Sequence, residues 1–208
     1  MAQIFKNTKI SFKVLFSILF FFSLPLFSDN KPENLKLAYY KGMYTNTNLG
    51  EILLKLDTHN RQSYINMFSI AKPFLKLWKA NIETEGQVGW HTGVQKHMEF
   101  NGLFLARFGA NKNLPVNFAV GEGLSLATRN PDLENPRKNV FYPSVESEYS
   151  NKLLNYLAFE VELSLPSLIG KNVPSPFFRV HHRSGVYGIF CPPTCGSNYL
   201  TYGVRWSY

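Results

Sequence analysis

After residue 28 the chain lacks any apolar run long enough to cross a membrane as a helix, for which about 20 residues are needed. It also shows little helical periodicity after residue 35. A polytopic helical membrane protein is therefore excluded. A chain with these properties either stays soluble or crosses a membrane as β-strands.

Several motifs of other protein classes are missing as well. The two cysteines, Cys191 and Cys195, are too few for a disulfide-dense scaffold or a structural zinc site made of thiolates. The chain has no Gly-x-Ser-x-Gly elbow of soluble esterases and no glycine-rich phosphate loop that opens a helix. Its basic residues do not alternate with aromatics along a stripe, which argues against a nucleic-acid groove. We expect no cofactor and assign no metal ligands. Glu83, Glu85 and His91, toward the outer end of the third expected strand, could line the outer rim or bind a cation, and ordinary loop polarity is the alternative.

The N-terminal segment has the pattern of a secretory signal peptide. Lys6, Lys9 and Lys13 precede an apolar run over 14–27, and Ser28 is a small residue at which cleavage could follow. We predict a signal peptide over 1–28 and a single exported domain over 29–208. The alternative is an uncleaved N-terminal anchor. In an oxidising compartment, the default for Cys191-Pro192-Pro193-Thr194-Cys195 is a local disulfide.

The rest of the chain is rich in aromatic residues, with 18 Phe, 11 Tyr and 3 Trp, arranged in runs of about ten residues between turn-rich stretches. This pattern is typical of a transmembrane barrel. We predict an all-β fold, an eight-stranded antiparallel transmembrane β-barrel of the bacterial outer membrane. Its strands are expected at 36–45, 62–71, 74–88, 96–107, 115–127, 151–164, 175–184 and 197–208. The segment 49–57 is either a further strand or a short helix, and 128–150 is a long outer loop.

The last strand alternates clearly. Asn198, Leu200, Tyr202, Val204, Trp206 and Tyr208 share one face, and polar or small residues share the other. A strand that ends the chain on an aromatic residue resembles the C-terminal signal of outer-membrane barrels. A soluble β-sandwich or a lipocalin-like binder would show the same alternation, and it is the less favoured alternative.

The strand near 152–164 places Glu160 and Glu162 on its polar face, which we expect to line the interior. Buried carboxylates need partners. Arg107, Arg179 and Arg205 have the parity to provide them.

The candidate site lies near the end of the seventh expected strand. His182 and Ser184 are two residues apart and therefore point the same way, with the face that we assign to lipid. An imidazole there could take the serine proton, and the hydroxyl could attack an acyl ester. Alternatively, both are ordinary interface residues. His181 faces the interior instead, so the adjacent histidines form a poor chelate.

This C-terminal hairpin resembles that of the PagL-type lipid A deacylases. The resemblance covers about the last thirty residues, through His182-Arg183-Ser184, the loop to Cys195 and the strand ending at Tyr208. It implies hydrolysis of the ester-linked acyl chain at the 3-position of lipid A, with Ser184 as nucleophile and His182 as base. The family has Asn after the serine, where this chain has Gly185. It also has a Glu at the start of the final strand, where this chain reads Gly196-Ser197-Asn198.

Two acidic residues are candidates for the missing carboxylate. Glu122 lies between two glycines late in the fifth strand, and Glu134 lies in the outer loop. The alternatives are that Glu122 sits in a bulge turned toward interior arginines and that Glu134 is a loop surface charge.

The expected partners are lipopolysaccharide with its lipid A and the outer-membrane bilayer. The competing function is a non-enzymatic barrel that is structural or binds a ligand through its loops.

Overall fold

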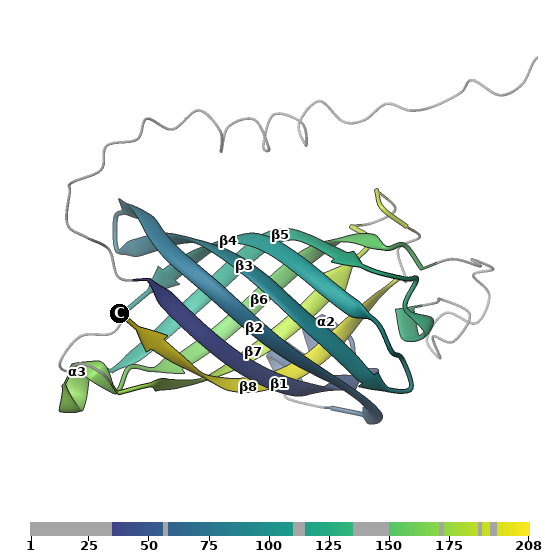
Figure 1. The fold of residues 1–208 in the computed structure, drawn as a ribbon, viewed down its shortest axis with the longest axis horizontal. Helices are drawn as coiled ribbons and strands as arrows, with labels where there is room; N and C mark the ends of the chain where they lie inside the picture. Colours follow the sequence, from purple (N-terminus) through teal and green to yellow (C-terminus); the bar gives the residue numbers. More distant parts are fainter. Residues whose placement is uncertain are drawn as a thin grey trace, which may run out of the picture. The chain divides into compact units, whose positions relative to one another are not determined.

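The computed structural model describes residues 35–55, 58–109, 115–134, 150–170, 173–186, 189–191 and 195–208. They form a closed antiparallel barrel in which each strand pairs with the next in sequence and β8 returns to pair with β1 (Figure 1). The strands are β1 (Lys36–Thr45), β2 (Asn60–Leu77), β3 (Ala80–Gly93), β4 (Met98–Phe108), β5 (Val116–Ala127), β6 (Leu153–Leu163), β7 (Ser175–Ser184) and β8 (Gly196–Ser207). The predicted eight-stranded antiparallel barrel is thereby confirmed. The expected signal peptide over 1–28 lies outside the described residues.

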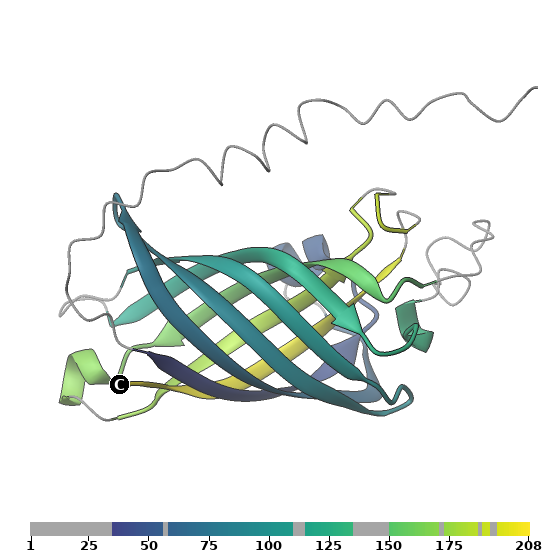
Figure 2. The same ribbon diagram turned by 45° about the horizontal axis from the view of Figure 1, so that its top comes forward.

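Three short helices lie in the connections: α2 (Leu49–Lys55), η1 (Asp132–Glu134) and α3 (Pro166–Ile169). The segment predicted as strand or helix is thus helical. No helix in the described part of the chain is long and apolar enough to cross a membrane. Because neighbouring strands are antiparallel, β1, β3, β5 and β7 all finish at one end of the barrel, which we call the site end. Figure 2 shows η1 at this end and α3 with the C-terminus at the other.

The boundary between β2 and β3 differs from the prediction. The second strand is expected to end at residue 71 and the third to begin at residue 74, so Pro73, which lacks a backbone donor, falls between them. Instead β2 continues to Leu77, and the chain reverses at Trp78, which takes a positive φ of 59°. A register shift between Pro73 and Leu75 marks a bulge, which is a position where a sheet tolerates proline.

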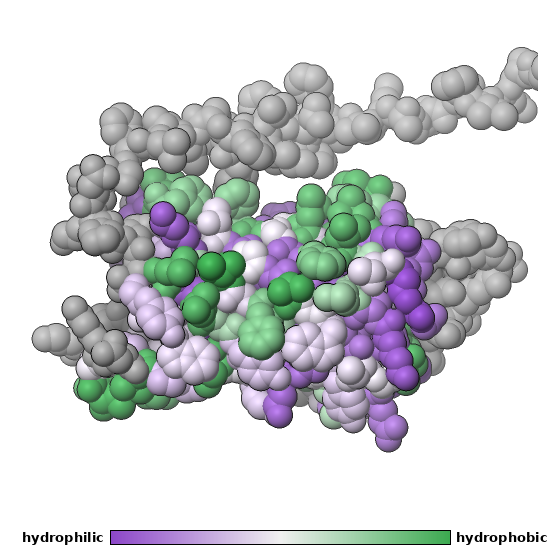
Figure 3. All heavy atoms as spheres, in the orientation of Figure 1, coloured by the Kyte–Doolittle hydropathy of each residue, from purple (hydrophilic) through white to green (hydrophobic). Residues whose placement is uncertain are grey.

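Apolar side chains cover much of the outer face of the barrel. The large ones that are exposed on strands include Phe68, Ile70, Val88, Trp90, Phe100, Phe104, Phe118, Val120, Leu124, Leu126, Val161, Phe178 and Tyr202. Figure 3 shows apolar residues over the visible wall, with hydrophilic ones gathered toward the site end. A soluble barrel has the opposite arrangement, with a polar outer face. The polar residues that alternate with the apolar ones along each strand therefore point into the interior.

Part of the interior is filled by an ion-pair cluster of four acidic and four basic side chains, which we call the arginine–glutamate network: Glu83, Glu85, Glu160 and Glu162 with Lys36, Arg107, Arg179 and Arg205. Glu160 accepts hydrogen bonds from Arg107 at 2.7 Å and from Arg205 at 2.5 Å. Arg179 donates to both oxygens of Glu85, at 2.6 and 3.0 Å. The prediction that interior arginines partner the glutamates of β6 is confirmed.

Candidate functional site

His182 and Ser184 lie on the outer face of β7, at the site end, and both are half-buried. Their neighbours follow from the strand register. His182 pairs with Leu157 on β6 and with Asn198 on β8. Ser184 pairs with Asn155 on β6 and with Gly196 on β8. The four polar side chains of His182, Ser184, Asn155 and Asn198 therefore share one patch on a largely apolar wall.

The imidazole of His182 is held by the side-chain amide of Asn198. Nδ1 of His182 lies 2.5 Å from Oδ1 of Asn198. The amide nitrogen of Asn198 donates to the Thr47 carbonyl oxygen at 2.8 Å, which fixes the amide orientation and leaves Oδ1 as an acceptor. Nδ1 of His182 must therefore carry the proton. In the neutral ring Nε2 then keeps its lone pair, which is the tautomer that a general base requires.

The hydroxyl of Ser184 lies at the start of a tight turn. Its Oγ accepts a hydrogen bond from the Val186 backbone N–H at 3.1 Å. Val186 has a φ of 47°, a left-handed conformation that β-branched residues rarely adopt. Such backbone strain concentrates at functional sites. Among the described residues, no hydrogen bond joins Ser184 to His182, so the serine proton is not committed to the imidazole in this state.

Asn155 lies directly across from Ser184. Its Nδ2 donates to the Gly123 carbonyl oxygen of β5 at 3.1 Å, which uses one of its two N–H groups and leaves the second for another acceptor. An amide N–H beside a serine hydroxyl is a suitable donor to an oxyanion.

The structure does not bring Glu134 to His182. Glu134 is buried inside the site end, where Oε1 accepts from Arg183 at 2.7 Å and from Ser197 at 2.6 Å. Arg183 faces the interior, whereas His182 faces outward, so Glu134 lies behind the wall from the imidazole. Burial raises the pKa of the Glu134 carboxyl, against the opposing effect of the Arg183 guanidinium. Glu134 is therefore not the exposed loop charge that the sequence left open.

Glu122 is exposed on the outer face of β5. It pairs with Leu157, which in turn pairs with His182, so Leu157 separates the two titratable residues in one row. Two strand spacings place their backbones about 10 Å apart. The register of β5 is continuous with both neighbours, so the alternative of a bulge that turns Glu122 inward is wrong.

Asn198 is the residue that the sequence analysis missed as a partner of His182. The alternation of the last strand places Asn198 on the outer face, but only the carboxylates Glu122 and Glu134 were expected to orient the imidazole of His182. An amide oxygen can also orient an imidazole, as in Cys-His-Asn sites. The cross-strand pairing with His182 is the signal that identifies it, and that pairing requires the register.

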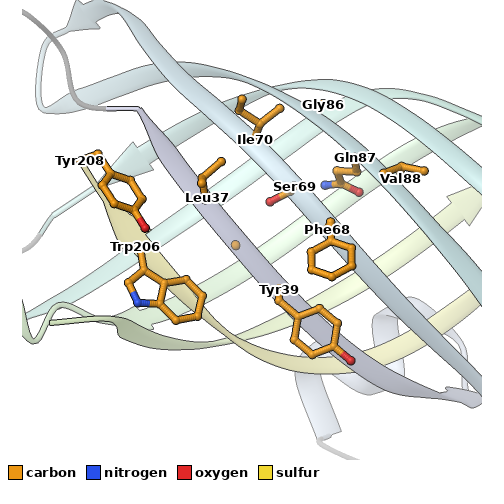
Figure 4. A pocket seen from close by; sticks show the side chains of 11 residues that line it. Leu37, Tyr39, Phe68, Ser69, Ile70, Gly86, Gln87, Val88, Trp206 and Tyr208 are labelled. Carbon is orange, nitrogen blue, oxygen red and sulfur yellow. The ribbon is translucent and has the colours of Figure 1, made fainter. Parts of the chain in front are cut away.

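A separate hollow lies on the outer wall over β8, β1, β2 and β3 (Figure 4). It has a volume of about 650 Å³, and its lining is largely apolar, with Leu37, Phe68, Ile70 and Trp206 around it. Trp206 is eight residues from Asn198 on the same strand, about 27 Å along an extended chain. The hollow therefore does not belong to the His182 patch.

No protein-family model matches the chain, and no curated protein is significantly similar to it. The solved structures that are similar to it include the following two. The outer membrane enzyme PagL is 10% identical with a TM-score of 0.47, over 82% of this chain and 98% of that one. Neisserial surface protein A (NspA) is 10% identical with a TM-score of 0.46, over 84% and 97%. At these values neither likeness carries a residue role or a function over to this chain.

Proposed function

We propose that this barrel resides in a bacterial outer membrane and is a serine esterase acting on the acyl chains of lipid A. The location is supported by the apolar outer wall, the charge-balanced interior and the expected signal peptide. A reactive group on the outer face meets membrane lipid directly. A lipid ester, such as those of lipopolysaccharide, is therefore the substrate class that fits this placement.

In the proposed reaction, Ser184 Oγ attacks the ester carbonyl carbon while Nε2 of His182 takes the hydroxyl proton. Asn198 keeps the proton on Nδ1 and stabilises the ring in this orientation. The second N–H of Asn155 would donate to the oxyanion. Collapse of the tetrahedral intermediate expels the sugar hydroxyl with the proton from His182 and leaves an acyl-serine. Water, deprotonated by His182, then releases the fatty acid and restores Ser184.

The observation that carries this proposal is the chain of contacts from Thr47 through Asn198 to His182. It selects one imidazole tautomer and, among the residues that the structure describes, leaves Nε2 without a hydrogen-bond partner on the face that carries Ser184.

The experiment is mass spectrometry of lipid A from cells that express the wild-type chain, Ser184→Ala, His182→Ala or the control Ser125→Ala. The Ser125 hydroxyl faces the barrel interior. We expect loss of one hydroxyacyl chain with wild type and with Ser125→Ala, and a fall of at least about 10³-fold in rate for the two site variants. Folding is checked by the heat-dependent gel mobility of the barrel.

Labelling by a fluorophosphonate separates the nucleophile from the substrate. Labelling of wild type but not of Ser184→Ala would support the esterase even if lipid A is unchanged, and the substrate would then be another lipid ester. If folded wild type neither labels nor alters lipid A, the esterase proposal fails.

The second candidate is a non-enzymatic barrel that is structural or binds a ligand. Two observations favour it. Ser184 Oγ is bonded to the Val186 N–H rather than to His182. No carboxylate among the described residues contacts the imidazole. This candidate predicts that Ser184→Ala and wild type behave identically in both assays.

A further inference from the structure

A second group of titratable side chains lies inside the barrel at the site end, on the β3–β4 hairpin. His91 is near the end of β3, His97 is in the connection, and Glu99 is near the start of β4. The His91 backbone N–H donates to the His97 carbonyl at 2.8 Å, which places the two histidines opposite each other. All three side chains are buried, and one potential ligand atom from each lies within 4.8 Å of the others.

Glu99 is held by two histidines. His91 Nε2 lies 2.8 Å from one carboxylate oxygen, and His181 Nε2 lies 2.8 Å from the other. Because an ionised carboxylate only accepts, both Nε2 atoms carry protons in this state. The opposite ring nitrogens accept from phenols, His91 Nδ1 from Tyr199 at 3.0 Å and His181 Nδ1 from Tyr156 at 3.1 Å. These two rings are therefore fully hydrogen-bonded.

His97 differs from both. Its ring stacks on that of His91, with centroids 3.9 Å apart and planes 14° apart. The residue is only 7% exposed, yet neither ring nitrogen has a hydrogen-bond partner in the described part of the chain. An unsatisfied buried polar group costs about 1–3 kcal/mol, so a ring with two such atoms requires an explanation.

We infer that His91, His97 and Glu99 form a binding site for a divalent transition-metal ion such as Zn²⁺. Two imidazoles and a carboxylate are a known ligand set for zinc, which leaves a fourth position open. Zinc ligands at about 2.0–2.2 Å lie roughly 3.4 Å from one another in a tetrahedron. The present spread of the ligand atoms brackets that spacing. Because the two imidazoles are stacked, the His97 ring must rotate out of the stack so that its lone pair and that of His91 point at the same ion.

The protons balance without a charged imidazole. On binding, the His91 proton moves from Nε2 to Nδ1, and Nε2 takes the metal. The Tyr199 oxygen becomes the acceptor of the Nδ1 proton, and its own hydroxyl proton turns toward Ser63, with which it shares a hydrogen bond. One nitrogen of neutral His97 coordinates directly. His181 keeps its hydrogen bond to the second Glu99 oxygen, which is the outer-shell contact that orients a ligating carboxylate.

This site is independent of the proposed esterase. Its ligands face the interior of the barrel, whereas His182 and Ser184 face outward. Metal binding would therefore persist in Ser184→Ala, and its failure would leave the esterase proposal untouched.

The test uses the full exported chain refolded in detergent, with Co²⁺ absorption and Zn²⁺ calorimetry. The key variant is His97→Ala, which removes no hydrogen bond found in the described chain and should leave the fold intact. The matched control is His59→Ala, in the connection before β2. Loss of an outer-shell partner costs about 10–100-fold in affinity, so we expect His97→Ala to bind at least about 100-fold more weakly. His59→Ala should bind as wild type does.

Glu99→Gln is a second variant, and its folding is checked by gel mobility because it also loses a buried charge. Co²⁺ bands typical of tetrahedral nitrogen and oxygen ligation in wild type, absent in His97→Ala, would support the site. If wild type binds neither ion, or if His97→Ala binds as tightly as wild type, the inference is overturned. A water-filled gap beside His97 would then be the remaining explanation for its unpaired nitrogens.

Discussion

Replacing Glu160 by Gln tests the arginine–glutamate network most directly. Glu160 is buried and contacts three guanidinium groups, those of Arg107, Arg179 and Arg205, at 2.5–2.9 Å. Within the network the four acidic and four basic groups balance, so the substitution leaves one positive charge of the network uncompensated while the side-chain volume is kept. Removing one partner of a buried ion pair costs about 3–5 kcal/mol. We expect a loss of that size in the free energy of unfolding.

The assay is urea-dependent unfolding of the barrel in lipid vesicles, followed by tryptophan fluorescence and gel mobility. Glu51→Gln is the matched control, because Glu51 forms an exposed helical pair with Lys55 at 3.7 Å, worth about 0.3–0.5 kcal/mol. Combining Glu160→Gln with Arg205→Gln restores the charge balance and should cost less than the sum of the two single changes. A loss below about 1 kcal/mol for Glu160→Gln would refute the view that this network is a tightly balanced core.

Three further predictions concern local features. Gly42→Ala should lower the free energy of unfolding by about 1–3 kcal/mol, because a Cβ there would overlap a carbonyl oxygen of β8. Gly50→Ala is the control, since a Cβ there meets open space and should change the free energy of unfolding by no more than about 1 kcal/mol. Equal effects of the two substitutions would contradict the close contact between β1 and β8. Asn198→Ala should lower kcat about 100-fold with little change in KM, because the imidazole of His182 would no longer be held in place. An unchanged kcat in a lipid-ester assay would show that Asn198 does not belong to the site. The disulfide between Cys191 and Cys195, which is expected from the sequence, closes a short loop. Its reduction should therefore lower the free energy of unfolding by at most about 2 kcal/mol and leave the barrel folded. Unfolding of the barrel on reduction would show that the disulfide has a wider role.

Much of the barrel could be predicted from the sequence because the side-chain period of a strand is local. The alternation in β6 and β8 correctly assigns Glu160 to the interior and Trp206 to the outer wall. The partner arginines follow from the same parity. The strand boundary at Pro73 could not be predicted, because whether a proline ends a strand or occupies a bulge depends on the pairing strand.

The candidate site was likewise predicted only in part from the sequence. The sequence alone determined that His182 and Ser184 share a face, since residues two apart on a strand must do so. Only the tertiary structure decided what surrounds them. The register between β7 and β8 sets Asn198 beside His182, and the closure of the barrel encloses Glu134 behind the wall. Pairings between strands depend on contacts between residues distant in sequence, and a local pattern of alternation carries no information about which residues will meet.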